Sequence, residues 1–215
     1  SEGLWQGGKV KQHNLKPDYY YMKGHKSLSG HGSDKDMAQN SLKFLKEGII
    51  KYNISTVIDI PCGDVNWQFD TWQTDSLKAY VGLDVVHAVI NLDKQRFCHH
   101  SNKVFAPWNF ATCALPQIVA NGTARPADLV HVRDVIQHMT LRDAARALKH
   151  DVRSGARFLI ATTYPAAENR NIEEGRWYPN NLLKAPCNFP APISCIKTHT
   201  RGEADSTCLW KIDWV

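Results

Sequence analysis

The chain has 215 residues, of which 43% are hydrophobic and 22% are charged, and its formal net charge at pH 7 is +5. A chain of this size and composition is large enough for one globular domain with a central sheet and flanking helices. Its basic residues are scattered, which argues against a nucleic acid partner, and no apolar run approaches the ~18 residues of a membrane span.

The first 28 residues carry aromatic and basic side chains without a sustained period. We expect residues 1–28 to form an arm or a lid, and residues 29–215 to form the single folded domain. Ser29 and Gly30 open a glycine-rich turn that leads into the first helix.

A helix is predicted directly after this turn, with Ser33 or Asp34 as its cap. Its apolar residues recur at helical spacing and predict one face packed against the sheet. These residues are Ala38, Leu42, Leu45 and Ile49.

The stretch from Ser55 to Trp67 organises the rest of the chain. A short apolar run ends at Asp59 and is followed at once by a sharp turn built on Pro61 and Gly63. This order predicts a buried parallel strand whose carboxyl end opens into a ligand crevice. The anion of Asp64, directly after the turn, would repel a phosphate and suits a ligand that carries positive charge.

An apolar run that ends at an acidic residue occurs again, in weaker form, at the second predicted strand, Ala79 to Leu83, which leads to Asp84. Asp84 follows Asp59 at close to the ~20-residue offset at which a second-strand acid meets a ribose in dinucleotide-type units. Two carboxylates at the tips of adjacent parallel strands can hold a nucleoside ligand.

The catalytic candidate follows the strand predicted over Asp128 to Asp134. If the chain turns helical after Arg133, Asp134 and His138 stand at positions i and i+4 and face the same side. A histidine that a carboxylate holds in the correct tautomer is a suitable general base. His131, within the strand, is expected to be a core residue.

The remaining regular elements are predicted from periodicity. A helix covers Thr140–Val152, with its first residue and Asp143 in capping-box positions. A fifth buried strand covers Arg157–Thr163, and two β-runs over Ile193–Thr198 and Cys208–Val215 form a terminal hairpin.

A long stretch without periodicity, over residues 169–190, lies between the fifth predicted strand and the terminal hairpin. A loop of this length inside a compact domain is usually functional. It mixes amides, an arginine and aromatic rings, which suits a polar, ring-shaped acceptor. We expect Arg176, Trp177 and Asn180 to bind that acceptor.

The six cysteines include no C-x-x-C pair, so we expect no metal site. Reduced thiols and a cytoplasmic location are the corresponding expectations.

The sequence Asp-Ile-Pro-Cys-Gly-Asp-Val-Asn-Trp at residues 59–67 resembles motif I of the class I S-adenosylmethionine (SAM) methyltransferases. It departs from the usual acid-x-Gly-x-Gly-x-Gly, because Pro61 and Val65 stand at the first and third glycines. This variant resembles a subfamily of small methyltransferases from bacterial capsule loci and large algal viruses that modify sugars and glycans. The resemblance runs from about residue 29 to the C-terminus. It implies an α/β, single-domain Rossmann-like fold with a seven-stranded, mostly parallel sheet and a C-terminal antiparallel hairpin.

The resemblance also implies that SAM is the cofactor and S-adenosylhomocysteine (SAH) the product. After the short third strand, Val104–Phe105, many relatives carry an Asp that binds adenine; Asn109 stands there in this chain, and Trp108 or Phe110 can flank the ring. A similar Arg-Asp-x-x-x-His in the relatives supports His138 as the base and Asp134 as the residue that orients it. The expected cofactor-binding residues are Ser29, Gly30, Asp59, Gly63, Asp84, Val85, Trp108, Asn109, Phe110 and Arg133.

From these features we expect a SAM-dependent O-methyltransferase whose partner is a glycan or sugar acceptor, methylated at a hydroxyl. Three alternatives stay open. The enzyme can act on another small molecule, with a metal held by Asp134 and other acids, or on nucleic acid; or the protein is a SAM-binding regulator without activity.

Overall fold

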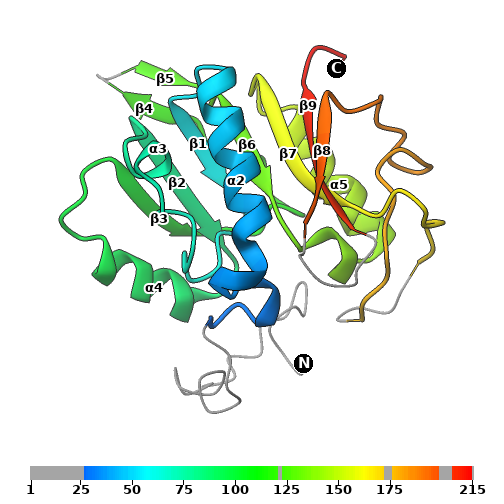
Figure 1. Ribbon diagram of the computed structural model, residues 1–215, viewed down its shortest axis with the longest axis horizontal. Helices are drawn as coiled ribbons and strands as arrows, with labels where there is room; N and C mark the ends of the chain where they lie inside the picture. The colour runs from blue at the N-terminus through cyan, green and yellow to red at the C-terminus, as the bar shows by residue number, and fades with distance from the viewer. Residues whose placement is uncertain (1–26, 121–122, 172–175, 199–204, 215) are drawn as a thin grey trace.

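The computed structural model describes residues 27–120, 123–171, 176–198 and 205–214. Most of the expected N-terminal arm therefore lies outside the described residues, as does most of the segment that joins the two runs of the expected terminal hairpin. The helices and strands, in chain order, are η1 (His31–Ser33), α2 (Lys35–Lys51), β1 (Thr56–Asp59), α3 (Trp72–Asp75), β2 (Ala79–Asp84), α4 (His87–Arg96), β3 (Lys103–Pro107), β4 (Ile118–Ala120), β5 (Thr123–Arg125), β6 (Leu129–Val132), η2 (Ile136–His138), α5 (Leu141–Val152), β7 (Phe158–Thr163), β8 (Ser194–Lys197) and β9 (Ser206–Lys211) (Figure 1).

Seven strands form one sheet in the order β3-β2-β1-β6-β7-β9-β8. Strand β9 runs antiparallel to both of its neighbours, and the other pairs are parallel. This confirms the predicted sheet, including its antiparallel C-terminal pair. The chain builds β1, β2 and β3 in one direction and then places β6 on the other side of β1. The carboxyl ends of β1 and β6 therefore flank the point where the strand order reverses, which is where open α/β sheets bind ligands.

Both faces of the central strands are buried, because alternate residues pack against helices on opposite sides. Val57 and Ile160 belong to the core beneath α2, whereas Ile58 and Leu159 belong to the core beneath α5. Figure 1 shows α2 in front of the sheet and α5 behind it. The continuous burial of β7 is what its uninterrupted apolar run predicted.

The two long helices begin differently. Thr140 caps α5 as predicted, since its hydroxyl accepts a hydrogen bond from the Asp143 N–H (3.2 Å). Asp34 stands at the N-cap position of α2, but its side chain makes no capping bond there. It lies 2.8 Å from Nδ1 of His31 instead. The cap position is confirmed, while the expected capping bond is replaced by a bond within the glycine-rich turn.

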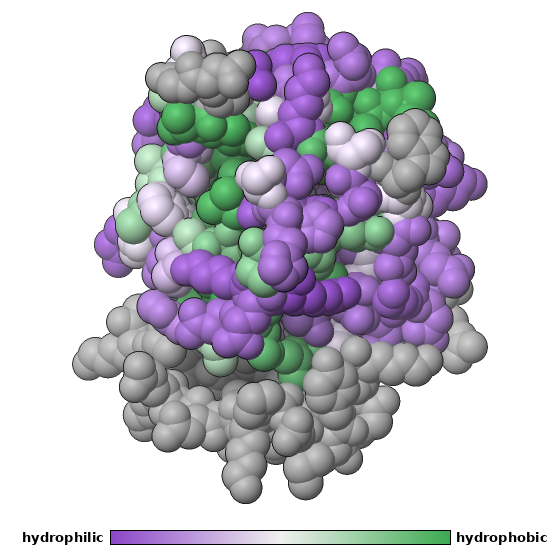
Figure 2. Space-filling view, turned by 90° about the vertical axis from the view of Figure 1, so that its left-hand side faces the viewer, coloured by the Kyte–Doolittle hydropathy of each residue, from purple (hydrophilic) through white to green (hydrophobic). Residues whose placement is uncertain are grey.

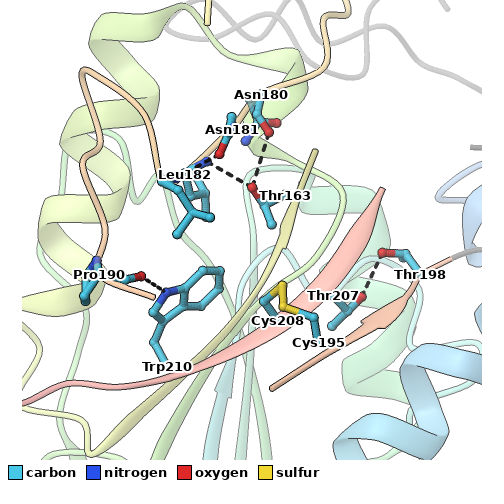
Figure 3. The surroundings of a disulfide bond; sticks show 11 residues. Thr163, Asn180, Asn181, Leu182, Pro190, Cys195, Thr198, Thr207, Cys208 and Trp210 are labelled. Carbon is cyan, nitrogen blue, oxygen red and sulfur yellow. Dashed lines mark hydrogen bonds between the residues drawn. A yellow bond between two sulfur atoms is a disulfide. The ribbon is translucent and has the colours of Figure 1, made fainter. Parts of the chain in front are cut away.

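A disulfide joins Cys195 on β8 to Cys208 on β9 (Figure 3). The two residues stand directly opposite each other in the antiparallel ladder. The expectation that the cysteines are all reduced thiols is therefore wrong for this pair. Spacing along the sequence could not show it, because the pairing depends on which residues of the two strands are opposed. The cytoplasmic location stays a prediction, and one that a disulfide does not favour.

The end of the molecule at the edge strand β3 is shown in Figure 2, where hydrophilic side chains predominate and hydrophobic residues form small, separate areas. Val104 and Val119 are among the exposed hydrophobic residues. The separate hairpin of β4 and β5 was not expected from the sequence. None of the helices in the described part of the chain is long and apolar enough to cross a membrane.

Candidate active site

The turn after β1 is held by the segment that precedes α2. The Asp64 carboxylate accepts hydrogen bonds from the Ser27 hydroxyl (2.7 Å) and the Leu28 N–H (2.7 Å). The Ser29 hydroxyl also donates to this carboxylate (3.3 Å) and accepts from the Asp64 N–H (3.0 Å). Two predicted cofactor residues, Ser29 and Gly63, are thereby brought together.

The backbone has a positive φ at three positions in the turn after β1 and the segment before α2. Gly30 and Gly63 have φ values of 93° and 58°. Val65, which stands where the usual motif has its third glycine, has a φ of 45°, a strained conformation for a β-branched residue. Asp64, between Gly63 and Val65 in the sequence, is buried and hydrogen-bonded to other residues of the protein. Its carboxylate therefore belongs to the hydrogen bonding of the turn itself, and its preference for a positively charged ligand stays a prediction.

Asp59, at the end of β1, lies inside the protein. Its carboxylate accepts hydrogen bonds from the Tyr80 hydroxyl and the Gln68 amide, and it lies 2.7 Å from Nδ1 of His131. His131 is buried, as predicted for a core histidine. The carboxylate ties β1 to β2 and β6, and a direct bond to a cofactor would compete with these three partners.

Asp84, at the end of β2, accepts hydrogen bonds from the N–H groups of Gly63 (3.1 Å) and Val86 (2.9 Å). Burial raises the pKa of Asp84 to about 6, although these N–H bonds act in the opposite direction. The carboxylate is therefore mainly ionised at pH 7. It joins the turn after β1 to the loop that contains Val85, and its remaining lone pairs can accept bonds from ribose hydroxyls.

The tip of β3 lies beside the tip of β2, since the Trp108 N–H donates to the Asp84 carbonyl (2.8 Å). Trp108 is half-buried, and its buried indole N–H has no hydrogen-bond partner among the described residues. Oδ1 of Asn109 accepts a bond from the Ala111 N–H (3.1 Å) and keeps a second lone pair. Phe110 lies in the core beneath α5, so Trp108 is the less buried ring at this tip.

Arg133, directly after β6, is buried and reaches toward the start of α2. Its guanidinium donates to the Ser41 hydroxyl (3.0 Å) and the Gly32 carbonyl (2.8 Å). It also lies 5.3 Å from the centre of the Trp67 ring and 3.1 Å from the Asp134 carboxylate. Arg133 therefore fastens the glycine-rich turn to the tip of β6.

The chain does not turn helical directly after Arg133. Asp134 is left-handed, with a φ of 53°, and a short 3-10 helix covers only Ile136–His138. The expectation that Asp134 and His138 stand at i and i+4 of one helix is therefore wrong. The two side chains are nevertheless close enough to interact. Burial lowers the pKa of His138 below its usual value, while the charge of Asp134 and a hydrogen bond with the Arg176 backbone act to raise it.

The loop after β7 crosses the tips of β6 and β7. The Tyr178 N–H donates to the Gln137 carbonyl (3.0 Å), and the Tyr164 N–H donates to the Asn180 carbonyl (2.7 Å). The Thr163 hydroxyl also bonds to the Asn180 carbonyl (3.4 Å) (Figure 3). This part of the loop is thereby held beside His138.

The three predicted acceptor residues differ in exposure. Arg176 is exposed, Trp177 is 48% exposed, and Asn180 is buried. The Trp177 ring meets the Tyr164 ring edge to face, with 5.8 Å between the ring centres. An open aromatic face and a buried amide therefore lie on one short segment.

Two buried polar residues at this site were not predicted. Burial raises the pKa of Asp93 to about 8, and the negative charge of Asp64 adds to this shift. No sequence signal marks Asp93, since an acid on a helix is normally exposed.

Gln137 is the second of these residues, and it donates through Nε2 to the Asp134 carboxylate (3.4 Å). Its place between Asp134 and His138 in the sequence was the available signal.

No family model matches the sequence, and no curated protein matches it either. Among solved structures, the chain is similar to magnesium protoporphyrin IX methyltransferase (ChlM) from Synechocystis PCC 6803 with bound SAM, with a TM-score of 0.57 and 15% identity over 79% of this chain and 76% of that chain. It is also similar to the N-methyltransferase NodS from Bradyrhizobium japonicum WM9 in complex with SAH, with a TM-score of 0.55 and 16% identity over 79% and 83% of the two chains. These likenesses show that the chain has the α/β, Rossmann-like fold of SAM-dependent methyltransferases.

Proposed function

We propose that the protein is a SAM-dependent O-methyltransferase whose acceptor is a sugar hydroxyl of a glycan or an activated sugar. The observation that carries this proposal is His138, a half-buried imidazole with a lowered pKa that lies beside Asp134 and next to the strand tips. The two similar structures were determined with SAM and SAH, which supports the choice of cofactor.

The residues at the strand tips fit SAM. The Asp84 carboxylate has lone pairs for ribose hydroxyls. The indole N–H of Trp108, which has no partner among the described residues, stands where we expect adenine. Ser29, Gly30 and Gly63 form the turn on which the methionyl part would lie. When bound, SAM supplies an electrophilic methyl group on a sulfonium and leaves as SAH.

His138 provides the base that a sugar hydroxyl needs, because a hydroxyl is a poor nucleophile until its proton is leaving. The lowered pKa keeps the imidazole neutral at pH 7. Its bond with the Arg176 backbone favours the protonated ring, so it is a bond that the ring donates to the carbonyl. The other ring nitrogen is then the acceptor. This nitrogen would take the proton of the hydroxyl as the hydroxyl oxygen attacks the methyl group that SAM would supply.

The acceptor class is supported by the segment that follows Arg176. The exposed face of Trp177 suits stacking on the C–H groups of a sugar ring, and the Asn180 amide suits its hydroxyls. Scattered basic residues give little support to a nucleic acid acceptor.

The first test is the transfer of labelled methyl from SAM to a panel of oligosaccharides, small phenols and RNA, with and without a chelator. Label on a sugar regardless of chelator supports the proposal, and label only on phenols or RNA contradicts the acceptor. Chelator sensitivity would assign Asp134 to a metal. Within the described ranges, no group of three or more His, Cys, Asp or Glu residues lies close enough to hold one.

The second test is His138→Ala. General bases contribute about 10²–10⁴-fold to rate, so we expect kcat to fall by at least about 100-fold. SAH affinity, measured by calorimetry, should be kept. The matched control is His99→Ala, since His99 is exposed and precedes β3, at the end of that strand opposite to its tip. Turnover that is unchanged in His138→Ala would contradict the assigned base.

A further inference from the structure

Two buried carboxamides beside His138 have hydrogen-bonding atoms without partners. Oε1 of Gln137, and both Oδ1 and Nδ2 of Asn180, are buried and unpaired among the described residues. The two residues are only 3% and 2% exposed. Because buried polar groups are normally hydrogen-bonded, such orphaned atoms indicate a ligand that supplies the missing partners.

The two carboxamides belong to chain segments that are bonded to each other. The Tyr178 N–H donates to the Gln137 carbonyl (3.0 Å), and Asn180 follows two residues later. Nε2 of Gln137 donates to the Asp134 carboxylate (3.4 Å), so its oxygen is the open end of the group. Gln137 and Asn180 therefore lie on two segments that meet at the tips of β6 and β7, and the segment of Gln137 also carries Asp134 and His138.

The chemistry of the unpaired atoms defines what they can bind. Oε1 of Gln137 can only accept, so it needs an O–H or N–H donor. The Asn180 amide offers donors and an acceptor, which match a hydroxyl group, itself both donor and acceptor. Two hydroxyls on neighbouring carbons of a sugar ring supply this combination.

We propose that Gln137 and Asn180 form an acceptor subsite that binds a free hydroxyl next to the one that is methylated. This inference rests on the proposed function and adds to it a specificity: the preferred acceptor carries at least one unmodified hydroxyl beside the reacting one. Tyr178 is not part of the subsite. Its hydroxyl also has no hydrogen-bond partner in the described part of the chain, but it lies close enough to Cys187 for the two groups to interact.

The neighbouring residue Asn181 is a matched control, because it is equally buried but fully bonded. Its Nδ2 donates to the carbonyls of Pro165 (2.8 Å) and Ala167 (3.2 Å), and its Oδ1 accepts from the Leu183 N–H (3.0 Å). Figure 3 shows the two asparagines side by side at the end of β7. The Asn181 side chain has a structural role, whereas the Asn180 side chain has atoms without partners among the described residues that a ligand can bond.

The first measurement is the thermal unfolding of Asn180→Leu and Asn181→Leu. Asn181→Leu loses three hydrogen bonds and should unfold at a clearly lower temperature. Asn180→Leu loses no side-chain bond and removes an unpaired buried amide, so its Tm should be equal to or above that of the wild type. A fall in Tm as large as that of Asn181→Leu would overturn the subsite, because it would show that the amide is bonded within the protein.

The second measurement is kinetic and uses the oligosaccharide with the highest rate in the acceptor panel, together with its deoxy analogues. A site built to bond a hydroxyl loses affinity when either partner of the bond is missing. Asn180→Leu and Gln137→Met remove the protein's partner, so they should raise KM for the parent about tenfold or more. The wild type should prefer the parent over the analogue deoxygenated next to the reacting hydroxyl, and the variants should lose this preference. SAH affinity should be kept.

Each outcome separates the subsite from the proposed function. A sugar that is methylated with unaltered KM in both variants overturns the subsite and leaves the function standing. A loss of SAH affinity assigns the carboxamides to the cofactor and also overturns the subsite. If no sugar is methylated, the proposed function fails, and the comparison of Asn180→Leu with Asn181→Leu still tests whether Asn180 carries an unpaired amide.

Discussion

A Cβ atom at Gly63 would lie 2.2 Å from Oγ of Ser29. The turn after β1 and the segment before α2 therefore fit together only with a glycine at this position. The contact is specific, because the same Ser29 hydroxyl bonds the N–H and the carboxylate of Asp64. The expected cofactor turn is thus built jointly by two segments that are distant in the sequence.

Gly63→Ala should weaken SAH binding about tenfold or more and lower the Tm. The new methyl group must displace Ser29, and the alanine must adopt the left-handed backbone conformation of this position. Gly30→Ala is the control. Its backbone (φ 93°, ψ 177°) lies in a region that glycine adopts far more readily than other residues, but nothing lies within 4 Å of the new Cβ, so it carries only the conformational cost of about 1–3 kcal/mol. Calorimetry with SAH and thermal unfolding measure both effects. Because Gly30 also belongs to the expected cofactor turn, the control applies to the unfolding measurement, and equal falls in Tm in the two variants would show that the contact with Ser29 does not matter.

Asp134→Asn should lower kcat about tenfold or more and move the acid limb of the kcat–pH profile to lower pH. The charge of Asp134 raises the pKa of His138, so its removal lowers that pKa further. A base acts in its neutral form, and activity is lost as pH falls through its pKa. Asparagine tolerates the left-handed backbone at this position. An acid limb that stays in place or moves upward would argue against the coupling of these two residues.

The stability of the protein should fall as pH rises from about 4 to about 8 through the contribution of Asp93. Its pKa is raised to about 8 in the folded protein, so across this window the folded state holds a proton that the unfolded state has released. Each unit of such a shift corresponds to about 1.4 kcal/mol. Asp93→Asn should flatten the dependence of Tm on pH and raise the Tm at pH 8 and above. A variant with the unchanged pH dependence would contradict the assignment.

Reduction of the disulfide between Cys195 and Cys208 should lower the free energy of unfolding by about 2–3 kcal/mol, the value for a loop of about this size. The two cysteines are separated by 13 residues. Denaturant unfolding with and without reductant measures the change, and Cys195→Ser should be insensitive to reductant. Alkylation of both thiols in protein that was never reduced would contradict the bond.

The predicted strands agree closely with the structure where local pattern and burial coincide. The apolar runs that lead to Asp59 and Asp84 form β1 and β2, and their acids lie at neighbouring tips because parallel strands present their carboxyl ends at one edge of a sheet. The helical spacing expected for Asp134 and His138 is wrong, since the left-handed backbone of Asp134 has no signature in a non-glycine sequence.

The sequence by itself determined the seven strands of the main sheet and their order along the chain, the turn after β1 and the strand tips at which the candidate residues lie. These depend on periodicity and on turn residues, which are local. The tertiary structure alone decided that Asp64 is bonded to the segment before α2, that Cys195 pairs with Cys208, and that the Gln137 and Asn180 carboxamides have atoms without a partner among the residues that the structure describes. Each of these depends on which side chains meet across long separations in the chain, and no local pattern contains that information.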